Sequence, residues 1–158
     1  CTSCHNTHEL GLNFDKCVAC HAGVKSPQEI RMAAGDYDGD KDVKEGVAGE
    51  IATMEEKLFA ALQTYAKDVA KVAIAYSPTA YPYFYADANG NGAADKDEKA
   101  YTDWTPRLLR AAYNYQYVQK DPGVFAHNPK YAAQILYDAM EDLSKGGVKV
   151  DMAGMTRP

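Results

Sequence analysis

Two Cys-x-x-Cys-His pentapeptides lie within the first twenty-one residues, Cys1-Thr2-Ser3-Cys4-His5 and Cys17-Val18-Ala19-Cys20-His21. This spacing is the attachment signature of c-type haem, because two thiols so placed reach the two vinyl groups of one porphyrin. The adjacent imidazole then binds the iron as its proximal ligand. The sequence therefore predicts two covalently attached haem c groups, with His5 and His21 as their proximal ligands.

The same cysteines also resemble a four-thiolate zinc ribbon, in which two Cys-x-x-Cys pairs bind one ion. A ribbon gives no reason for a histidine directly after each pair, and the chain has only four histidines among 158 residues. All four cysteines of the chain belong to these two pairs. The haem interpretation is therefore favoured over zinc and over a pair of disulfides.

The two remaining histidines, His8 and His127, are the candidates for the distal sides of the irons. His8 lies three residues after His5, a reach of at most about 10 Å, which is too short to pass around a macrocycle. We therefore expect His8 to ligate the second haem and His127 the first. Methionine is the competing distal ligand, and the chain offers Met32, Met54, Met140, Met152 and Met155. Either choice leaves both irons six-coordinate, which favours electron transfer over catalysis.

Two acidic, glycine-bearing stretches follow the haem segment. Residues 87–98 match the twelve-residue EF-hand loop, with oxygen ligands at the first, third, fifth and ninth places, glycine at the sixth and glutamate at the twelfth. A backbone carbonyl completes the set, so the predicted calcium ligands are Asp87, Asn89, Asn91, Ala93, Asp95 and Glu98. A solvated polar turn is the alternative, because Asn-Gly repeats form turns without a metal.

The first acidic stretch has the Asp-x-Asp-x-Asp opening of such a loop, but Lys41 replaces the turn glycine and Val47 stands at the twelfth place. A shortened loop closed by Glu45, or by Glu50 from the following helix, would still supply oxygen ligands for a hard cation. A second calcium ion is therefore predicted here, with a solvated acidic loop as the alternative. Its candidate ligands are Asp36, Asp38, Asp40, Asp42 and Glu45.

Helices are the elements that must position these residues. Apolar residues recur every three or four positions from Ile51 to Tyr76, which predicts one long helix that Ser77-Pro78 ends. A second helix begins with Thr105 as its N-cap and Pro106 in its first turn, and it stops before Asp121-Pro122.

The last long helix begins at Asn128-Pro129 and ends at Gly146-Gly147, so His127 precedes it at a rigid chain entry. No strand pattern of any length is found. The predicted class is all-α, with few long helices, long loops, EF-hand-like calcium loops and no significant sheet. Residues 1–30 would form a dihaem attachment segment, and residues 31–158 a helical domain that packs on the haems in one compact unit.

The net charge of −5 disfavours nucleic acid and anionic membranes as partners. No stretch of the sequence has the apolar length of a transmembrane helix, so no membrane insertion is expected. Attachment of haem to thiols is completed outside the cytoplasm, which indicates an extracellular or periplasmic protein whose signal peptide was removed. A haem-attaching Cys1 at the first position indicates processing or a fragment of a longer multihaem protein.

Residues 104–116, Trp-Thr-Pro-Arg-Leu-Leu-Arg-Ala-Ala-Tyr-Asn-Tyr-Gln, and residues 121–128, Asp-Pro-Gly-Val-Phe-Ala-His-Asn, add a family resemblance. Together with the haem motifs and the acidic loops, they resemble the C-terminal part of secreted multihaem c-type cytochromes of anaerobic prokaryotes. The resemblance implies a distal-ligand role for His127. Some extracellular multihaem cytochromes polymerise into conducting filaments, so it also implies end-to-end assembly, with His8 or His127 given to a haem of the next subunit.

The sequence thus predicts an electron carrier, not an enzyme, that passes single electrons to other copies of itself, to redox partner proteins or to an extracellular acceptor. A homo-oligomer or polymer is expected. The enzyme alternative is the C-terminal domain of a larger multihaem reductase whose active haem lies upstream. A third interpretation is a calcium-dependent binding module with zinc at the cysteines.

Overall fold

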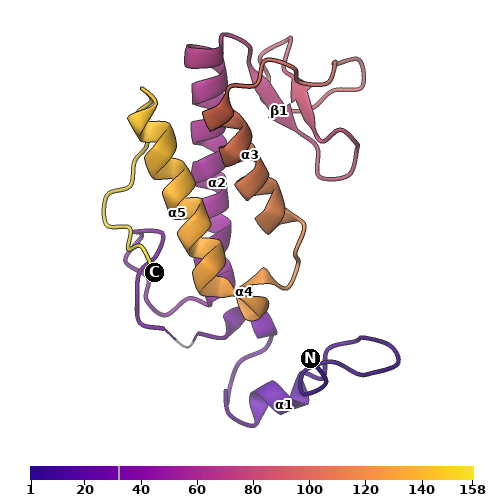
Figure 1. Ribbon diagram of the computed structural model, residues 1–158. Helices are drawn as coiled ribbons and strands as arrows, with labels where there is room; N and C mark the ends of the chain where they lie inside the picture. The colour runs from indigo at the N-terminus through magenta and orange to yellow at the C-terminus, as the bar shows by residue number, and fades with distance from the viewer. Residues whose placement is uncertain (32) are drawn as a thin grey trace.

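A bundle of three helices forms the body of the protein in the computed structural model, which describes residues 1–31 and 33–158. Helices α2 (Val47–Tyr65), α3 (Pro106–Gln119) and α5 (Pro129–Lys145) lie side by side (Figure 1). Burying a large apolar side chain in such a bundle contributes about 1.5–3 kcal/mol. The completely buried large apolar side chains of the bundle are Met54, Leu58, Leu62, Leu108, Leu136, Met140 and Leu143. The predicted mainly helical class is confirmed.

The ends of α3 and α5 lie where their capping residues predict them. The Thr105 hydroxyl accepts a hydrogen bond from the Leu108 amide at 3.1 Å, and Pro106 is the first residue of α3. Helix α5 begins at Pro129 and ends before Gly146, whose amide donates to carbonyls of the last turn. These local signals are sufficient to predict the helix ends, because capping residues pair with the backbone groups that the helix itself leaves unpaired.

The region after α2 departs from the predicted single helix over 51–76. Helix α2 ends at Tyr65, a π-helical turn η2 (Ala66–Ala70) follows, and Lys71 adopts a left-handed φ of 68° that stops the helix. Strand β1 (Ile74–Tyr76) then pairs antiparallel with β2 (Phe84–Ala86). The helix prediction is wrong beyond residue 70, and the expectation of no strand is wrong for this hairpin.

Aromatic packing explains why Tyr76 belongs to a strand and not to the helix. Its ring centroid lies 4.9 Å from that of Phe84 on β2 and 5.1 Å from that of Tyr115 on α3. Phe59 of α2 stacks on Tyr115 at 5.2 Å. These contacts hold the hairpin against the bundle, and such tertiary packing overrides a helical periodicity of apolar residues.

The second acidic loop, residues 87–98, follows directly after β2. Shortly after the loop, Ala100 forms a single β-bridge back to Tyr85 of β2. The Ala86 amide also donates to the Lys99 carbonyl at 2.8 Å, so the loop is closed at its base. Extended chain therefore borders this loop on both sides. The similarity to an EF-hand is limited to the loop residues, since an EF-hand places helices there.

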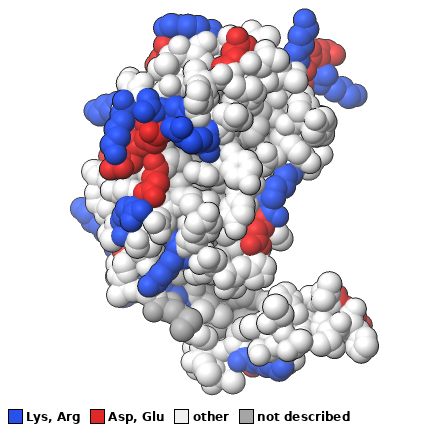
Figure 2. Space-filling view, viewed as in Figure 1, with Lys and Arg blue, Asp and Glu red and all other residues white. Residues whose placement is uncertain are grey.

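The N-terminal segment, with α1 (Asp15–Val18), projects from the bundle (Figure 1). Figure 2 shows this lobe protruding from the body, with few charged side chains on the visible face. No residue from 1 to 30 is fully buried. The lobe joins the body through the 3-10 turn η1 (Pro27–Glu29), which packs on α2 while the Val47 amide donates to the Ile30 carbonyl at 3.3 Å.

Glu55 of α2 makes the stability of the bundle depend on pH. Its Oε1 is buried without a hydrogen-bond partner among the residues that the structure describes, and burial raises the pKa of its carboxyl from 4.5 to about 7. A carboxyl whose pKa is raised on folding favours the folded state at low pH, and this stability is lost as pH rises through about 7. Between pH 5 and pH 8 we expect the free energy of unfolding of wild type to fall by about 2 kcal/mol more than that of Glu55→Gln. Urea unfolding at the two pH values measures this difference.

The matched control is Glu56→Gln, at the exposed neighbouring position of the same helix. It should leave the pH dependence of wild type unchanged. If Glu55→Gln and wild type lose the same stability between pH 5 and pH 8, the buried carboxyl is not responsible.

Candidate functional site

Both Cys-x-x-Cys-His motifs fold as the same helical turn. In the first, the amides of Cys4 and His5 donate to the Cys1 carbonyl at 3.1 and 2.8 Å. In the second, the amides of Cys20 and His21 donate to the carbonyl of the motif's first cysteine at 3.1 and 2.9 Å. Residues three and four apart share one face of a helical turn, so each motif presents both thiols and the imidazole together. All four thiols are free, as porphyrin attachment requires.

The fold brings His5, the predicted proximal ligand of the first haem, next to His127, the distal candidate from α4 (Val124–His127). The ring centroids of His5 and His127 lie 6.4 Å apart, with an angle of 43° between the ring planes. Two imidazoles that bind one iron from opposite sides, through bonds of about 2 Å, have centroids about 6.3 Å apart. The separation of the two rings therefore matches that of two imidazoles bound to one iron.

A carboxylate orients the His127 ring. Its Nδ1 lies 2.9 and 3.0 Å from the two oxygens of Asp121, and the His5 Nδ1 lies 2.8 Å from the Leu10 carbonyl. With Nδ1 as the donor, Nε2 of each ring is the nitrogen left to bind a metal. Burial raises the pKa of the Asp121 carboxyl, but hydrogen bonds from His127 and Gly123 outweigh burial and hold this pKa below its usual value.

Gly123 makes room for this arrangement. A Cβ at Gly123 would lie 2.6 Å from the Cε1 and 2.9 Å from the Nε2 of His127, so the imidazole ring would have to shift from its present position. The Gly123 amide also donates to the Asp121 carboxylate at 2.9 Å, and its carbonyl accepts from the His127 amide at 2.9 Å. Sequence reasoning gave neither Asp121 nor Gly123 a role. The available signal for these roles was an aspartate and a glycine within six residues before the candidate ligand His127.

The other two candidate ligands are less closely defined. His8 is exposed, and its amide donates to the Asn6 side chain at 2.9 Å, while His21 is half-buried. No contact between these two rings is found in the part of the chain that the structure describes. The assignment of His8 to the second iron stays a prediction.

The methionine alternatives differ in burial. Met54 and Met140 are completely buried in the helical bundle, which removes them from reach of a haem on the projecting lobe. Met152 and Met155 pack partly buried against the core. Met32 lies outside the described residues.

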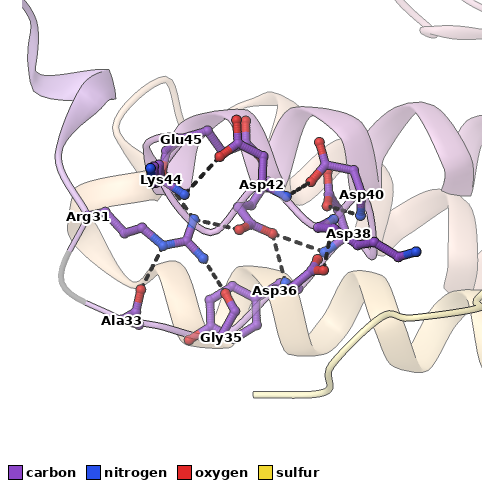
Figure 3. A network of polar contacts seen from close by, with 12 residues as sticks. Arg31, Ala33, Gly35, Asp36, Asp38, Asp40, Asp42, Lys44 and Glu45 are labelled. Atoms are coloured by element: carbon purple, nitrogen blue, oxygen red, sulfur yellow. Dashed lines mark hydrogen bonds and ion pairs between the residues drawn. The ribbon is translucent and has the colours of Figure 1, made fainter.

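The first acidic loop gathers its carboxylates into two overlapping groups (Figure 3). The first consists of Asp36, Asp38 and Asp40, and the second of Asp38, Glu45 and Glu50; within each group the ligand oxygens lie within 4.8 Å of one another. Asp42 belongs to neither group. Glu50, which the sequence offered only as an alternative closing residue, comes from the first turn of α2.

Burial and mutual repulsion raise the pKa values of two carboxyl groups near this loop, those of Asp38 and Glu45. Burial, followed by repulsion from Asp38 and Glu50, raises the pKa of Glu45 to about 7. Burial is also the main cause that raises the pKa of Asp38. Arg31 is the counter-charge: its guanidinium pairs with Glu50 and donates to three main-chain carbonyls, those of Ala33, Gly35 and Glu45 (Figure 3).

The second acidic loop orders its oxygen atoms by internal hydrogen bonds. The Asp87 carboxylate accepts from the amides of Gly90, Asn91 and Gly92 at 2.7–3.1 Å. The Asp95 carboxylate accepts from both asparagine side chains at 2.8 Å. The Glu98 carboxylate accepts from two further amides, those of Ala88 and Asp95. Gly92, at the sixth place, has the positive φ of 78° that a sharp turn needs.

The sequence relatives of the chain are polyheme c-type cytochromes, which confirms the predicted resemblance to multihaem c-type cytochromes. It is 29% identical to the C-type polyheme cytochrome OmcC of Geobacter sulfurreducens over 86% of this chain. It is 25% identical to the C-type polyheme cytochrome OmcB of the same species over 96% of this chain. The chain spans only 17% and 22% of the lengths of these relatives.

No family model matches the sequence, and no solved structure matches it. Among the described residues, no helix combines the length and the apolar character needed to cross a membrane.

Proposed function

We propose that the chain is an electron-transfer protein that carries two covalently attached haem groups, each bound by two histidines. The observation that carries this proposal is the 6.4 Å separation of the His5 and His127 rings, which suits one iron between them. The repeated attachment motif and the relationship to polyheme c-type cytochromes support the same function.

Each residue of the site has a distinct role in this proposal. The first haem would be held by Cys1, Cys4, His5 and His127, and the second by Cys17, Cys20, His21 and His8. When bound, haem supplies a one-electron iron couple. Asp121 holds the His127 ring in the ligating orientation and raises its basicity by accepting the Nδ1 proton. Two histidine ligands for each haem would leave no coordination site on the iron for a substrate.

Mass and spectra of the purified protein test this function. We expect an intact mass equal to the polypeptide plus two haem groups, because every thiol belongs to an attachment motif. We also expect purely low-spin spectra and no binding of carbon monoxide, because each iron has two nitrogen ligands. A mass without porphyrin would refute the haem assignment, and a high-spin fraction in wild type would refute the bis-histidine assignment.

We further propose that the projecting lobe passes electrons to a neighbouring copy of the chain, in an end-to-end assembly, or to a redox partner protein. The exposure of the lobe supports this, because short distances between haem edges need an uncovered surface (Figure 1). The alternative is a domain of a larger multihaem reductase, since the relatives are several times longer. A map of the native particle in which iron positions are as close between chains as within a chain would support end-to-end assembly. Binding of nitrite or carbon monoxide by the native protein would support the reductase.

We also propose an extracellular or periplasmic location, which the haem attachment motifs support because thiol attachment is completed outside the cytoplasm. A structural calcium ion is proposed for residues 87–98. The hydrogen bonds that hold the carboxylates of Asp87, Asp95 and Glu98 within one closed loop support it.

A further inference from the structure

Three carboxylates, those of Asp38, Glu45 and Glu50, gather around the start of α2, and two of them have a buried oxygen without a hydrogen-bond or ion-pair partner among the described residues. Oxygens of Asp38, Glu45 and Glu50 lie within 4.8 Å of one another, and Asp38 and Glu50 are completely buried. Asp38 Oδ2 and Glu45 Oε1 are both enclosed and accept no hydrogen bond from any described residue. Leaving a buried polar oxygen without a partner costs about 1–3 kcal/mol, and more if it is charged. A ligand that supplies positive charge would remove this cost.

The charges around the three carboxylates indicate how much positive charge the bound ligand must supply. Arg31 pairs with Glu50 and offsets one negative charge. Lys57 donates to the main-chain carbonyl of Asp38, not to a carboxylate. Two of the three negative charges are therefore left without a paired cation. We propose that Asp38, Glu45 and Glu50 bind one divalent cation, and that this cation is Ca²⁺.

Burial favours calcium over magnesium. Calcium binds oxygen at about 2.3–2.6 Å, so ligand oxygens of one ion lie no more than about 5 Å apart, and the oxygens of these carboxylates lie within 4.8 Å of one another. Magnesium keeps several of its waters, and a group with two completely buried members leaves little space for them. Asp36 and Asp40 adjoin the group through Asp38 and would complete the ligand set from the loop side.

The proposed ion would connect the loop to α2. The Glu50 Oε2 already accepts from the amides of Tyr37 and Asp38 at 2.7 and 3.0 Å, and the Thr156 amide donates to the Asp36 carbonyl at 3.0 Å. A ligand from the helix thus replaces the glutamate that an EF-hand has at its twelfth place. This site does not depend on the proposed haem ligation.

Calorimetric titration of the full, haem-loaded chain with CaCl₂, after removal of divalent ions with EDTA, tests the site. The decisive variant is Glu45→Gln, because Glu45 is only partly buried and the change preserves its shape. We expect it to lose one equivalent of Ca²⁺ per chain, or to weaken one binding constant by about tenfold or more. Asp38→Asn should do the same. The variant Asp87→Asn should lose the Ca²⁺ equivalent proposed for the other acidic loop, residues 87–98, and so distinguishes the two sites.

The matched control is Asp42→Asn, which lies in the same loop but outside the group. It should change the binding constant by less than about threefold, because it alters only the surrounding charge. Equal losses in Asp42→Asn and Glu45→Gln, an unchanged equivalent in Glu45→Gln, or no Ca²⁺ binding by wild type would each overturn the proposal. So would tighter binding of Mg²⁺ than of Ca²⁺. Far-UV circular dichroism of each variant without Ca²⁺ verifies folding, and if Asp38→Asn does not fold, Glu45→Gln decides.

Discussion

Replacing His127 with alanine is expected to convert one of the two haem groups from low-spin to high-spin and to let it bind carbon monoxide. The reason is that its ring lies 6.4 Å from that of His5, the separation of two ligands on one iron. The side chain is 55% exposed, so its loss should leave the helical bundle folded. Electron paramagnetic resonance and carbon monoxide titration measure the change, with one equivalent bound per chain against none in wild type.

Two further variants separate ligation from indirect effects. Asp121→Asn removes the charge that orients His127 but keeps the ring, so the haem should stay low-spin. His8→Ala should open the other iron, and the double variant with His127→Ala should bind two equivalents of carbon monoxide. If His127→Ala stays entirely low-spin and binds none, another side chain is the distal ligand and the proposed pairing fails.

Replacing Arg31 with alanine is expected to destabilise the folded protein by about 3–5 kcal/mol, because it leaves the completely buried Glu50 without its counter-charge. The change also removes the donors for three main-chain carbonyls at the start of the helical body. Guanidinium unfolding followed by far-UV circular dichroism gives the free energy of unfolding. Adding Glu50→Gln should recover part of the loss, since it neutralises the stranded carboxylate.

The control is Arg110→Ala. Arg110 pairs with Asp142 at 3.0 Å, but the two side chains are 65% and 34% exposed, so solvent screens the pair and the loss should stay below about 1 kcal/mol. Comparable losses in Arg31→Ala and Arg110→Ala would mean that the buried pair contributes no more than a surface one.

Local signals in the sequence predicted the haem motifs and the ends of α3 and α5 well. A Cys-x-x-Cys-His turn or a Thr-Pro helix start depends on neighbours within a few residues, so the sequence contains all the information needed. The β1–β2 hairpin was missed because its strands are three residues long, and its packing partners Phe59 and Tyr115 are distant in the sequence.

The sequence could nominate candidate ligands for the site but not the residues that contact and orient them. His5 and His127 are rare residues that could be counted, whereas Asp121 and Gly123 are common residues whose roles depend on the position of one ring. Likewise the acidic loop was visible as a charge pattern. The pairing of Arg31 with Glu50 follows only from the packing of the chain that enters α2.

His5 and His127 come from opposite parts of the chain, one on the projecting lobe and the other on α4. An iron bound by both would act as a cross-link outside the peptide backbone, closing a loop that includes most of the polypeptide. Thiol attachment would need only the N-terminal motif, whereas the proposed bond from His127 to the iron would need a folded bundle. Maturation would therefore pass through a species with an unsaturated iron, and its disappearance would report the completion of folding.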